Sequence, residues 1–347
     1  MAIRYIGSKV RVVDAIMNFI GDPGPGSTFV DVFCGTGVVA EHAARRGWPI
    51  RLNDTLTSAT AIAAARITPA ALAPFRPFGG YTQAVAALNA VTAVEGFLWR
   101  EYSPASGRLS AVTRKYFTED NARRLDGMRR QIHRWKAEGV ISDSEERLLV
   151  GDVLAAVSRV ANTAGTYGCF LRDFTPTALQ PVAIVARKLF DRMVPVEIHN
   201  LDARDLVVAG ADVAYLDPPY TKRQYAAYYH ILETVAVGDE PHVNGITGLR
   251  PWRPKASDYC YKSRALNALV QLVDGLASRR VVLSYSSEGH VALEDLASRL
   301  ESLGGVKVQQ LGKVQRYRPN QRASSTGSSV NEYIVELVKS ASLDAVA

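Results

Sequence analysis

The sequence predicts an α/β fold, built on a mixed sheet whose last strand is antiparallel and carrying an inserted, mostly helical subdomain. A strand, a Gly-rich turn and a helix follow one another over residues 28–44. From residue 195 onwards, short apolar runs alternate with helical periodicity. Between these parts, residues 57–194 show helical periodicity broken by loops. We therefore expect a sheet domain over 1–56 and 195–347, with the insertion at 57–194.

The composition is that of a soluble globular protein, with 47% hydrophobic and 22% charged residues in a chain of 347. No apolar run reaches the roughly 18 residues that cross a bilayer, and the first residues contain no signal-peptide core. We expect no membrane association and a cytoplasmic location. The net charge of +7 fits a polyanionic partner, although many basic proteins bind no nucleic acid.

The three cysteines, Cys34, Cys169 and Cys260, are widely spaced and odd in number. They lack the paired spacing of a zinc site. We interpret them as free thiols in a reducing compartment, and we expect no metal.

The Gly-rich turn consists of Phe33-Cys34-Gly35-Thr36-Gly37. Its glycines allow the backbone to approach a ligand closely. It lacks the third glycine of the dinucleotide fingerprint and has no Gly-Lys-Ser/Thr phosphate loop, which disfavours a pyrophosphate cofactor and a nucleoside triphosphate. Asp54 follows a second strand, 49–53, at about 20 residues from the turn, where an acid can bind ribose hydroxyls. These features predict an adenosine-type ligand.

Helical periodicity predicts an N-terminal helix beginning near Val10 and capped by Ser8. Lys9 then lies on a loop at the helix N-terminus, although taken alone it is equally well a surface lysine. In the insertion the predicted helices are 82–98, 119–138, 143–163 and 179–193.

Basic residues of the insertion are interleaved with aromatic ones, as in Arg114-Lys115-Tyr116-Phe117. This pattern suits phosphate contacts and base stacking, and the alternative is an ordinary solvated helix face. Two further basic loops follow residue 220 and span 238–261. The predicted DNA contacts are Arg114, Lys115, Arg129, Arg130, Lys222, Arg223 and Arg253.

The C-terminal part contains predicted strands at 195–200, 213–216, 281–285, 306–311 and 332–338. The last two are joined by a polar loop, 316–329, without a helix, which predicts antiparallel pairing.

Asp217-Pro218-Pro219-Tyr220 follows the apolar strand 213–216. Neither proline can donate to a strand ladder, so the strand ends there. Asp217 and Tyr220 are thereby placed at a carboxyl end of the sheet, where open α/β folds bind ligands. A turn made of ordinary turn formers is the alternative.

In chain order, the segment 4–9 (Arg-Tyr-Ile-Gly-Ser-Lys), the turn 31–37, Asn53-Asp54, the long insertion, Asp217-Pro218-Pro219-Tyr220 and Ser284-Tyr285 resemble the Dam-type, α-group DNA adenine-N6 methyltransferases of restriction-modification systems. The resemblance implies a Rossmann-like S-adenosylmethionine-dependent methyltransferase sheet. The catalytic domain would be 1–56 and 195–347, and target recognition would lie mainly in 57–194. The partner would be double-stranded DNA and the enzyme a monomer, with a companion restriction endonuclease left open.

The resemblance also implies residue roles. Tyr5 and Lys9 would hold the methionine end of S-adenosylmethionine, Lys9 by pairing with the carboxylate. Asp54 would bind the ribose and Asp202 the adenine edge. The implied cofactor-binding residues are Tyr5, Lys9, Asp31, Phe33, Gly35, Gly37, Asp54, Asp202 and Asp217, and the implied catalytic residues are Asp217, Pro218, Pro219 and Tyr220.

These catalytic residues fit transfer of a methyl group to the exocyclic N6 amine of adenine. The amine's lone pair is delocalised into the ring, so it must be freed and aimed. The Asp217 carboxylate and the Pro218 carbonyl can each accept a hydrogen bond from one N6–H group. Tyr220 can stack on a base that is flipped out of a specific site in the duplex.

Two alternatives stay open. An enzyme of the same fold can act on RNA adenine or, with weaker support, on a protein glutamine, because the amine chemistry is similar. A catalytically idle DNA-binding subunit can also retain the fold, and binding of the cofactor without transfer to any DNA would favour it.

Overall fold

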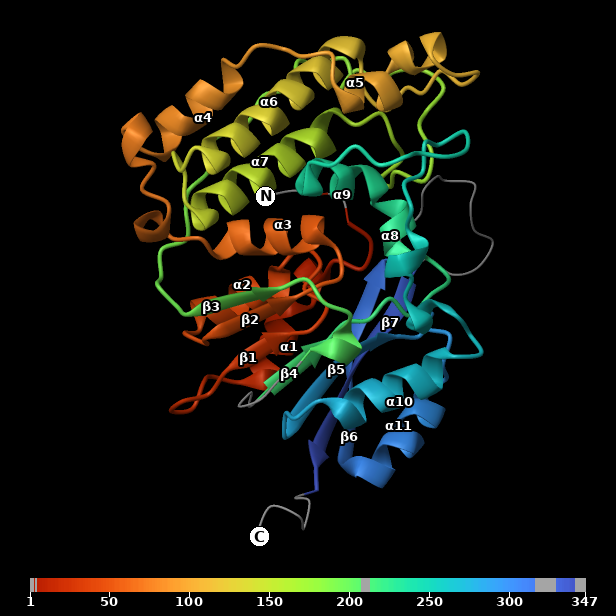
Figure 1. Ribbon diagram of the computed structural model, residues 1–347. Helices are drawn as coiled ribbons and strands as arrows, with labels where there is room; N and C mark the ends of the chain where they lie inside the picture. The colour runs from red at the N-terminus through yellow and green to blue at the C-terminus, as the bar shows by residue number, and fades with distance from the viewer. Residues whose placement is uncertain (1–2, 4, 207–212, 316–328, 341–347) are drawn as a thin grey trace. The chain divides into compact units, whose positions relative to one another are not determined.

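The computed structural model describes residues 3, 5–206, 213–315 and 329–340, so Arg4 and most of the predicted loop 316–329 lie outside the described residues. The chain divides into two compact units. The sheet unit comprises Gly7–Thr55, Val194–Gln224 and Ser257–Ala347, and the helical unit comprises Met1–Ile6, Leu56–Met193 and Tyr225–Ala256. Both are drawn in Figure 1. The helical unit thus contains Tyr225–Ala256 as well as most of the segment predicted as an insertion.

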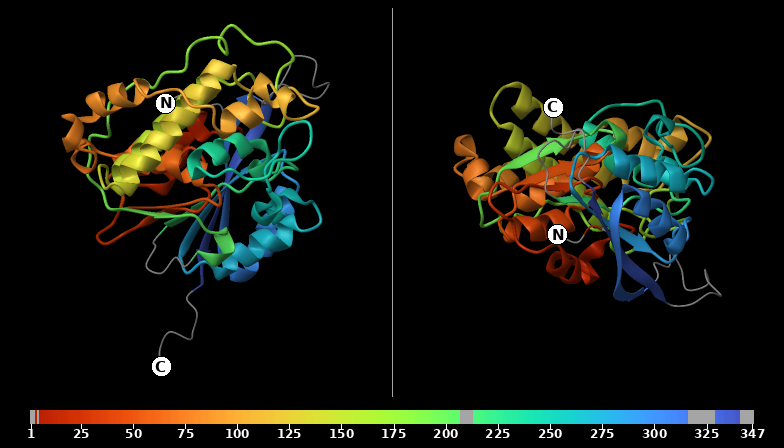
Figure 2. Two further views of the ribbon diagram at one scale, coloured as in Figure 1. Left: turned by 45° about the horizontal axis from the view of Figure 1, so that its top comes forward. Right: turned by 90° about the horizontal axis from the view of Figure 1, so that it is seen from below.

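The sheet unit contains, among the described residues, a seven-stranded sheet in the order β3-β2-β1-β4-β5-β7-β6. The strands are β1 Phe29–Asp31, β2 Ile50–Asn53, β3 Val196–His199, β4 Val213–Leu216, β5 Arg280–Ser286, β6 Gly304–Gln315 and β7 Ser329–Lys339. The first five are parallel, whereas β7 runs antiparallel to both of its neighbours. The predicted mixed sheet with an antiparallel last strand is confirmed. β6 and β7 pair with each other along most of their length and are drawn in blue in Figure 2.

The helices of the sheet unit are α1 Val13–Ile20, α2 Val38–Arg45, α10 Ala265–Gly275 and α11 Leu293–Leu300. Alternate residues of the strands, such as Val30 and Leu283, form a buried apolar cluster with Leu269 and Leu296 from α10 and α11. The predicted start of the first helix is wrong. Lys9–Arg11 form a 3-10 turn, α1 begins at Val13, and Ser8 makes no side-chain capping bond.

Strand directions bring three acidic residues to one edge of this sheet. Asp31 ends β1 and pairs in register with Tyr215 of β4. Asp217 lies two residues after Tyr215, and because side chains alternate along a strand, Asp31 and Asp217 share a face. β7 runs the other way, so its beginning lies at this edge, where Glu332 pairs in register with Ser286.

The helical unit contains α3 Thr57–Ile67, α4 Tyr81–Asn89, α5 Phe97–Tyr102, α6 Glu119–Ala137, α7 Asp143–Val160, α8 Tyr225–Tyr228 and α9 His230–Val237. The predicted helices 119–138 and 143–163 are confirmed as α6 and α7, which lie side by side in Figure 1. Thr118 caps α6, and a capping box of Ser142 and Glu145 begins α7. These helices contribute to a large buried apolar cluster in the unit.

Two helix predictions for this unit are wrong. The predicted helix 82–98 divides into α4 and α5. The connecting segment packs against α6 so closely that a Cβ at Gly127 would lie 2.4 Å from the Thr92 carbonyl oxygen. Residues 179–193 form no helix. Val182 and Ile184 are buried on alternate positions of an extended segment, which is a strand-like pattern rather than a helical one.

Asparagine side chains satisfy the backbone of this extended segment. Asn121 accepts a hydrogen bond from the Val182 N–H and donates to the Gln180 carbonyl. Asn89 accepts from the Ile184 N–H and donates to its carbonyl. Because buried backbone groups need partners, these two residues replace the intrahelical bonds that the periodicity predicts.

Of the three cysteines, Cys34 and Cys260 are buried and Cys169 is exposed, and all three are free thiols. In the part of the chain that the structure describes, no helix is long and apolar enough to cross a membrane.

Candidate active site

The Gly-rich turn joins β1 to α2 in the sheet unit. Gly35 and Gly37 have φ values of 49° and 72°, a backbone region that favours glycine. The Gly37 N–H donates to the Cys34 carbonyl at 2.7 Å, which closes the turn. The Gly35 N–H donates to Asp54 Oδ2 at 3.1 Å. The structure therefore places the predicted ribose-binding acid directly beside the turn.

Asp31 is the last residue of β1, just before this turn, and is 1% exposed. Its Oδ1 atom is buried and has no hydrogen-bond partner among the described residues. Burial raises the pKa of Asp31 well above its usual range, and the nearby charges of Asp217 and Asp54 raise it further, against a hydrogen bond from the Ala40 backbone. A buried carboxylate oxygen without a partner is costly, and a cationic ligand would remove that cost.

The segment from Asp217 to Tyr220 follows the fully buried β4. The Tyr220 ring lies 5.3 Å from the ring of Tyr285, centroid to centroid. The Tyr220 carbonyl accepts a hydrogen bond from the His290 N–H at 2.9 Å. Asp217 itself remains 18% exposed at the side chain. The carboxylate is thus partly accessible on a chain segment that is fixed at both ends.

Lys9 lies among these residues and is 5% exposed, so the interpretation as a surface lysine is wrong. Its Nζ atom lies 3.0 Å from Asp217 Oδ1 and 3.3 Å from Glu332 Oε2, and it donates to the Tyr220 hydroxyl at 3.3 Å. We call Lys9, Asp217, Tyr220 and Glu332 the Lys9 cluster.

Charge and burial oppose each other in the Lys9 cluster. Burial raises the pKa of Asp217 to about 6, Lys9 lowers it and Glu332 raises it. Burial lowers the pKa of Lys9, but Asp217, Tyr220 and Glu332 together outweigh burial and raise it well above its usual range. Lys9 therefore stays protonated, whereas Asp217 changes its charge near pH 6.

Sequence reasoning missed Glu332. The residue starts the predicted strand 332–338, which also contains Glu336, so its carboxylate does not stand out in the sequence. Its position beside Asp217 depends on the antiparallel direction of β7, which brings the first residues of that strand to the carboxyl edge of the parallel strands.

Three other predicted cofactor residues have internal partners. Phe33 packs edge-on against Tyr259 with centroids 5.4 Å apart. Both carboxylate oxygens of Asp202 accept hydrogen bonds from Arg204, which lower the pKa of Asp202. Tyr5 belongs to the helical unit, where it stacks on Tyr229 at 4.1 Å. Their contacts with a cofactor stay predictions.

Residues 5–298 match the family of D12 class N6 adenine-specific DNA methyltransferases. The chain belongs to this family. Its segments 31–37 and 217–220, which contribute to the site described above, both lie within the matched region, whereas Glu332 lies beyond it.

Similar proteins support the assignment to the D12 class. The type II methyltransferase M.FokI of Planomicrobium okeanokoites is 32% identical over 98% of this chain, which covers 53% of that protein. The modification methylase StsI of Streptococcus sanguinis is 31% identical over 96% of the chain, covering 51% of its length. The type II methyltransferase M.CviAII of Paramecium bursaria Chlorella virus 1 is 30% identical over 96% of the chain and 97% of its own length. The chain thus spans about half the length of the first two relatives.

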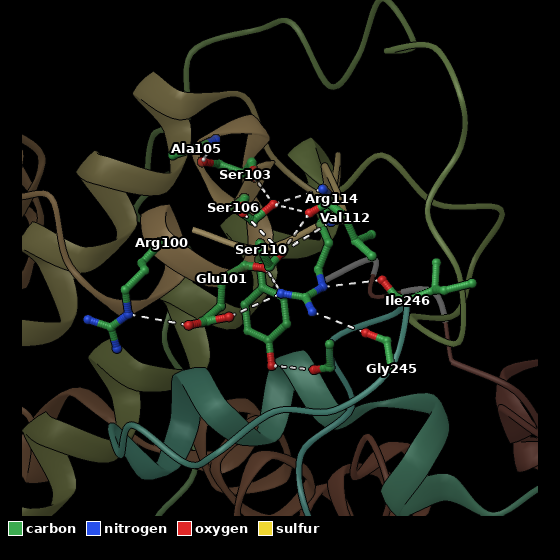
Figure 3. Close-up of polar contacts among 12 residues, drawn as sticks. Arg100, Glu101, Ser103, Ala105, Ser106, Ser110, Val112, Arg114, Gly245 and Ile246 are labelled. Atoms are coloured by element: carbon green, nitrogen blue, oxygen red, sulfur yellow. Dashed lines mark hydrogen bonds and ion pairs between the residues drawn. The ribbon is translucent and has the colours of Figure 1, made fainter. Parts of the chain in front are cut away.

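The residues predicted to contact DNA in this D12 class chain differ widely in exposure. Arg114 is buried, and its guanidinium lies between Glu101 and two backbone carbonyls, as Figure 3 shows. Nη1 donates to Glu101 Oε2 at 3.0 Å, Nη2 to the Gly245 carbonyl at 3.1 Å and Nε to the Ile246 carbonyl at 3.2 Å. Arg114 therefore connects two segments of the helical unit that are remote in sequence.

Arg129 is also buried in the helical unit. It donates to the carbonyls of Thr234 and Asp239 at 3.1 and 3.0 Å, and it pairs with Asp126 at 3.3 Å. The remaining predicted contacts lie nearer the surface. Lys115 and Arg223 are half-buried, whereas the exposed ones are Arg130, Lys222 and Arg253.

Proposed function

We propose that the chain transfers a methyl group from S-adenosylmethionine to the N6 amine of an adenine flipped out of a specific sequence in double-stranded DNA. The observation that carries the proposal is the partly exposed Asp217 carboxylate, fixed between a buried strand and two prolines and adjoining the buried Asp31. Membership of the D12 class supports the choice of adenine N6 as acceptor.

The residues at the site fit this cofactor. In the sheet unit the Lys9 ammonium pairs with the carboxylates of Asp217 and Glu332, and Asp31 lies near the charges of Asp217 and Asp54. This excess of negative charge favours a cation, and the unpartnered Asp31 oxygen fits the ammonium of the methionine moiety. When bound, S-adenosylmethionine supplies an electrophilic methyl group.

The role expected for Lys9 at the cofactor carboxylate stays a prediction. Its ammonium has three hydrogens, and its observed partners are Asp217, Glu332 and Tyr220. Pairing with the cofactor would require it to exchange or share one of these partners.

The chain's own residues would prepare the amine. The ionised Asp217 and the Pro218 carbonyl each accept a hydrogen bond from one N6–H group. These bonds free the nitrogen lone pair and stabilise the positive charge that develops on nitrogen. The two prolines restrict the backbone, so the acceptors are in place before the base arrives. Tyr220 provides a ring on which the flipped base can stack.

Among the predicted DNA contacts, the exposed residues Arg130, Lys222 and Arg253 would contact DNA. Target recognition would lie in the helical unit, including Tyr225–Ala256. The partner would be double-stranded DNA. The protein would be cytoplasmic and would act as a monomer. The names of the relatives, which include modification methylases, favour a companion restriction endonuclease.

Transfer of a labelled methyl group from S-adenosylmethionine to unmethylated duplex DNA tests the proposal, with RNA assayed in parallel and both products digested to nucleosides. We expect N6-methyladenine in DNA. Label in RNA alone would instead support an RNA adenine methyltransferase. Cofactor binding without any labelled acceptor would support a catalytically idle DNA-binding subunit.

A further inference from the structure

Glu332 is a buried carboxylate that the proposed chemistry does not use directly. It is 7% exposed at the start of β7. Its Oε2 atom lies 3.3 Å from Lys9 Nζ, and that same nitrogen lies 3.0 Å from Asp217 Oδ1. A buried acid beside a catalytic acid costs free energy, so its presence there calls for a reason.

We propose that Glu332 is a positioning residue, which holds the Lys9 ammonium and divides its charge between two carboxylates, thereby fixing the orientation and the proton affinity of Asp217. The inference rests on the proposed function, because it concerns the residue proposed to accept the amine hydrogens.

The contacts of Lys9 fix the position of its ammonium group. Lysine carries a point charge on a flexible four-carbon chain, and a single partner would leave that charge free to follow Asp217. Glu332 comes from β7, Tyr220 from the segment after β4, and both contact the same nitrogen. Contacts from two different parts of the sheet therefore hold the ammonium in place.

The charge balance gives Glu332 a second effect. Among the described residues, the titratable groups that act on Asp217 or respond to its charge are Lys9, Glu332, Tyr220, Tyr215 and Asp31. Of these, Lys9 favours the ionised form of Asp217, and Glu332 opposes it. With both present, the pKa of Asp217 is about 6. The carboxylate is then ionised at neutral pH and still basic enough to accept strong hydrogen bonds.

Two substitutions should move the pKa of Asp217 in opposite directions. Glu332→Gln keeps the shape but removes a negative charge, so the pKa of Asp217 should fall by about one unit. Lys9→Met removes the positive charge, so that pKa should rise by about one to three units. Because activity requires ionised Asp217, the acidic limb of the pH–rate profile should move to lower pH in the first variant and to higher pH in the second.

The experiment measures kcat against pH for the full chain and these two variants. Glu336→Gln is the matched control, since Glu336 lies on the same strand and pairs with Arg280 at 2.6 Å. Its acidic limb should coincide with that of the wild type. In the ligand-free protein, ¹³C NMR of labelled aspartate carboxyls, assigned with Asp217→Asn, should report the same opposite shifts.

A Glu332→Gln variant whose acidic limb and carboxyl titration match those of the wild type would overturn the inference, even if kcat or stability fell. Glu332 would then only help β7 to pack. A wild-type chain that methylates no nucleic acid would instead contradict the proposed function, and the NMR titration would still decide whether Glu332 controls Asp217.

Discussion

Lys9 in the sheet unit and Arg114 in the helical unit are both buried cations, but their surroundings differ. Arg114 pairs with one carboxylate, Glu101, and its other partners are backbone carbonyls. Lys9 lies between two carboxylates and a tyrosine hydroxyl. The planar guanidinium suits several fixed acceptors at once, whereas the lysine ammonium is a compact charge that can change partners.

The difference in surroundings indicates that Arg114 has a structural role, whereas Lys9 lies in a site suited to chemistry. Around Arg114 there is no excess of negative charge, because its partner Glu101 also pairs with Arg100, and the guanidinium ties the segment after α5 to the loop at Gly245 and Ile246. Around Lys9 negative charge is in excess, and the pKa values of Asp217 and Asp31 are raised. Perturbed carboxylates of this kind are typical of functional sites. Buried charge alone therefore does not indicate a functional site, whereas an excess of buried negative charge favours one.

The largest effect is expected at Asp217. Asp217→Ala should lower the rate of methyl transfer by about 10²–10³-fold, because one preorganised acceptor for the amine is lost. Glu332 and Tyr220 remain as partners for Lys9, so affinity for S-adenosylmethionine should change little. Single-turnover transfer and calorimetric binding measure the two quantities. Turnover close to that of the wild type would mean that the surroundings of Lys9 are no more reactive than those of Arg114.

A change in stability is expected at Arg114. Arg114→Met removes the buried donor of the Glu101 carboxylate and of three backbone carbonyls, so the free energy of unfolding should fall by about 3 kcal/mol. Urea denaturation followed by circular dichroism measures it, with the exposed Arg253→Ala as the control that should change by less than about 0.5 kcal/mol. A small effect at Arg114 would mean that its contacts are dispensable.

Much of the sheet unit was predictable because its signals are local. Each strand is a short apolar run, and prolines or glycines end the runs at 217–220 and 31–37. Asp217 was placed at a carboxyl end of the sheet by the apolar run and its two prolines, whereas Asp31 entered only through the family resemblance. The false helix at 179–193 shows the limit. Its apolar residues fit a helix, but Asn89 and Asn121, which satisfy its extended backbone, are remote in sequence.

The parts of the site that escaped prediction depend on tertiary register or on side-chain direction. Glu332 reaches Lys9 because β7 inserts antiparallel beside β5, a pairing that no local pattern fixes. A run of basic residues does not show which guanidinium groups turn inward, because consecutive helical residues point about 100° apart. Arg129 and Arg130 on α6 illustrate this, since the first is buried and the second exposed.

These two neighbours provide the mildest test of the comparison between structural and functional charge. Arg130→Ala should leave stability within about 0.5 kcal/mol but weaken DNA binding, and it should reduce the slope of log affinity against log salt by about 1. Arg129→Ala should lower the free energy of unfolding by about 3 kcal/mol, because Asp126 and two carbonyls lose a buried donor, and it should leave the salt slope unchanged. Titrations of duplex DNA at several salt concentrations measure the slope. An unaltered slope in Arg130→Ala would show that its charge is only solvated surface, and DNA contact would then have to come from Lys222 or Arg253.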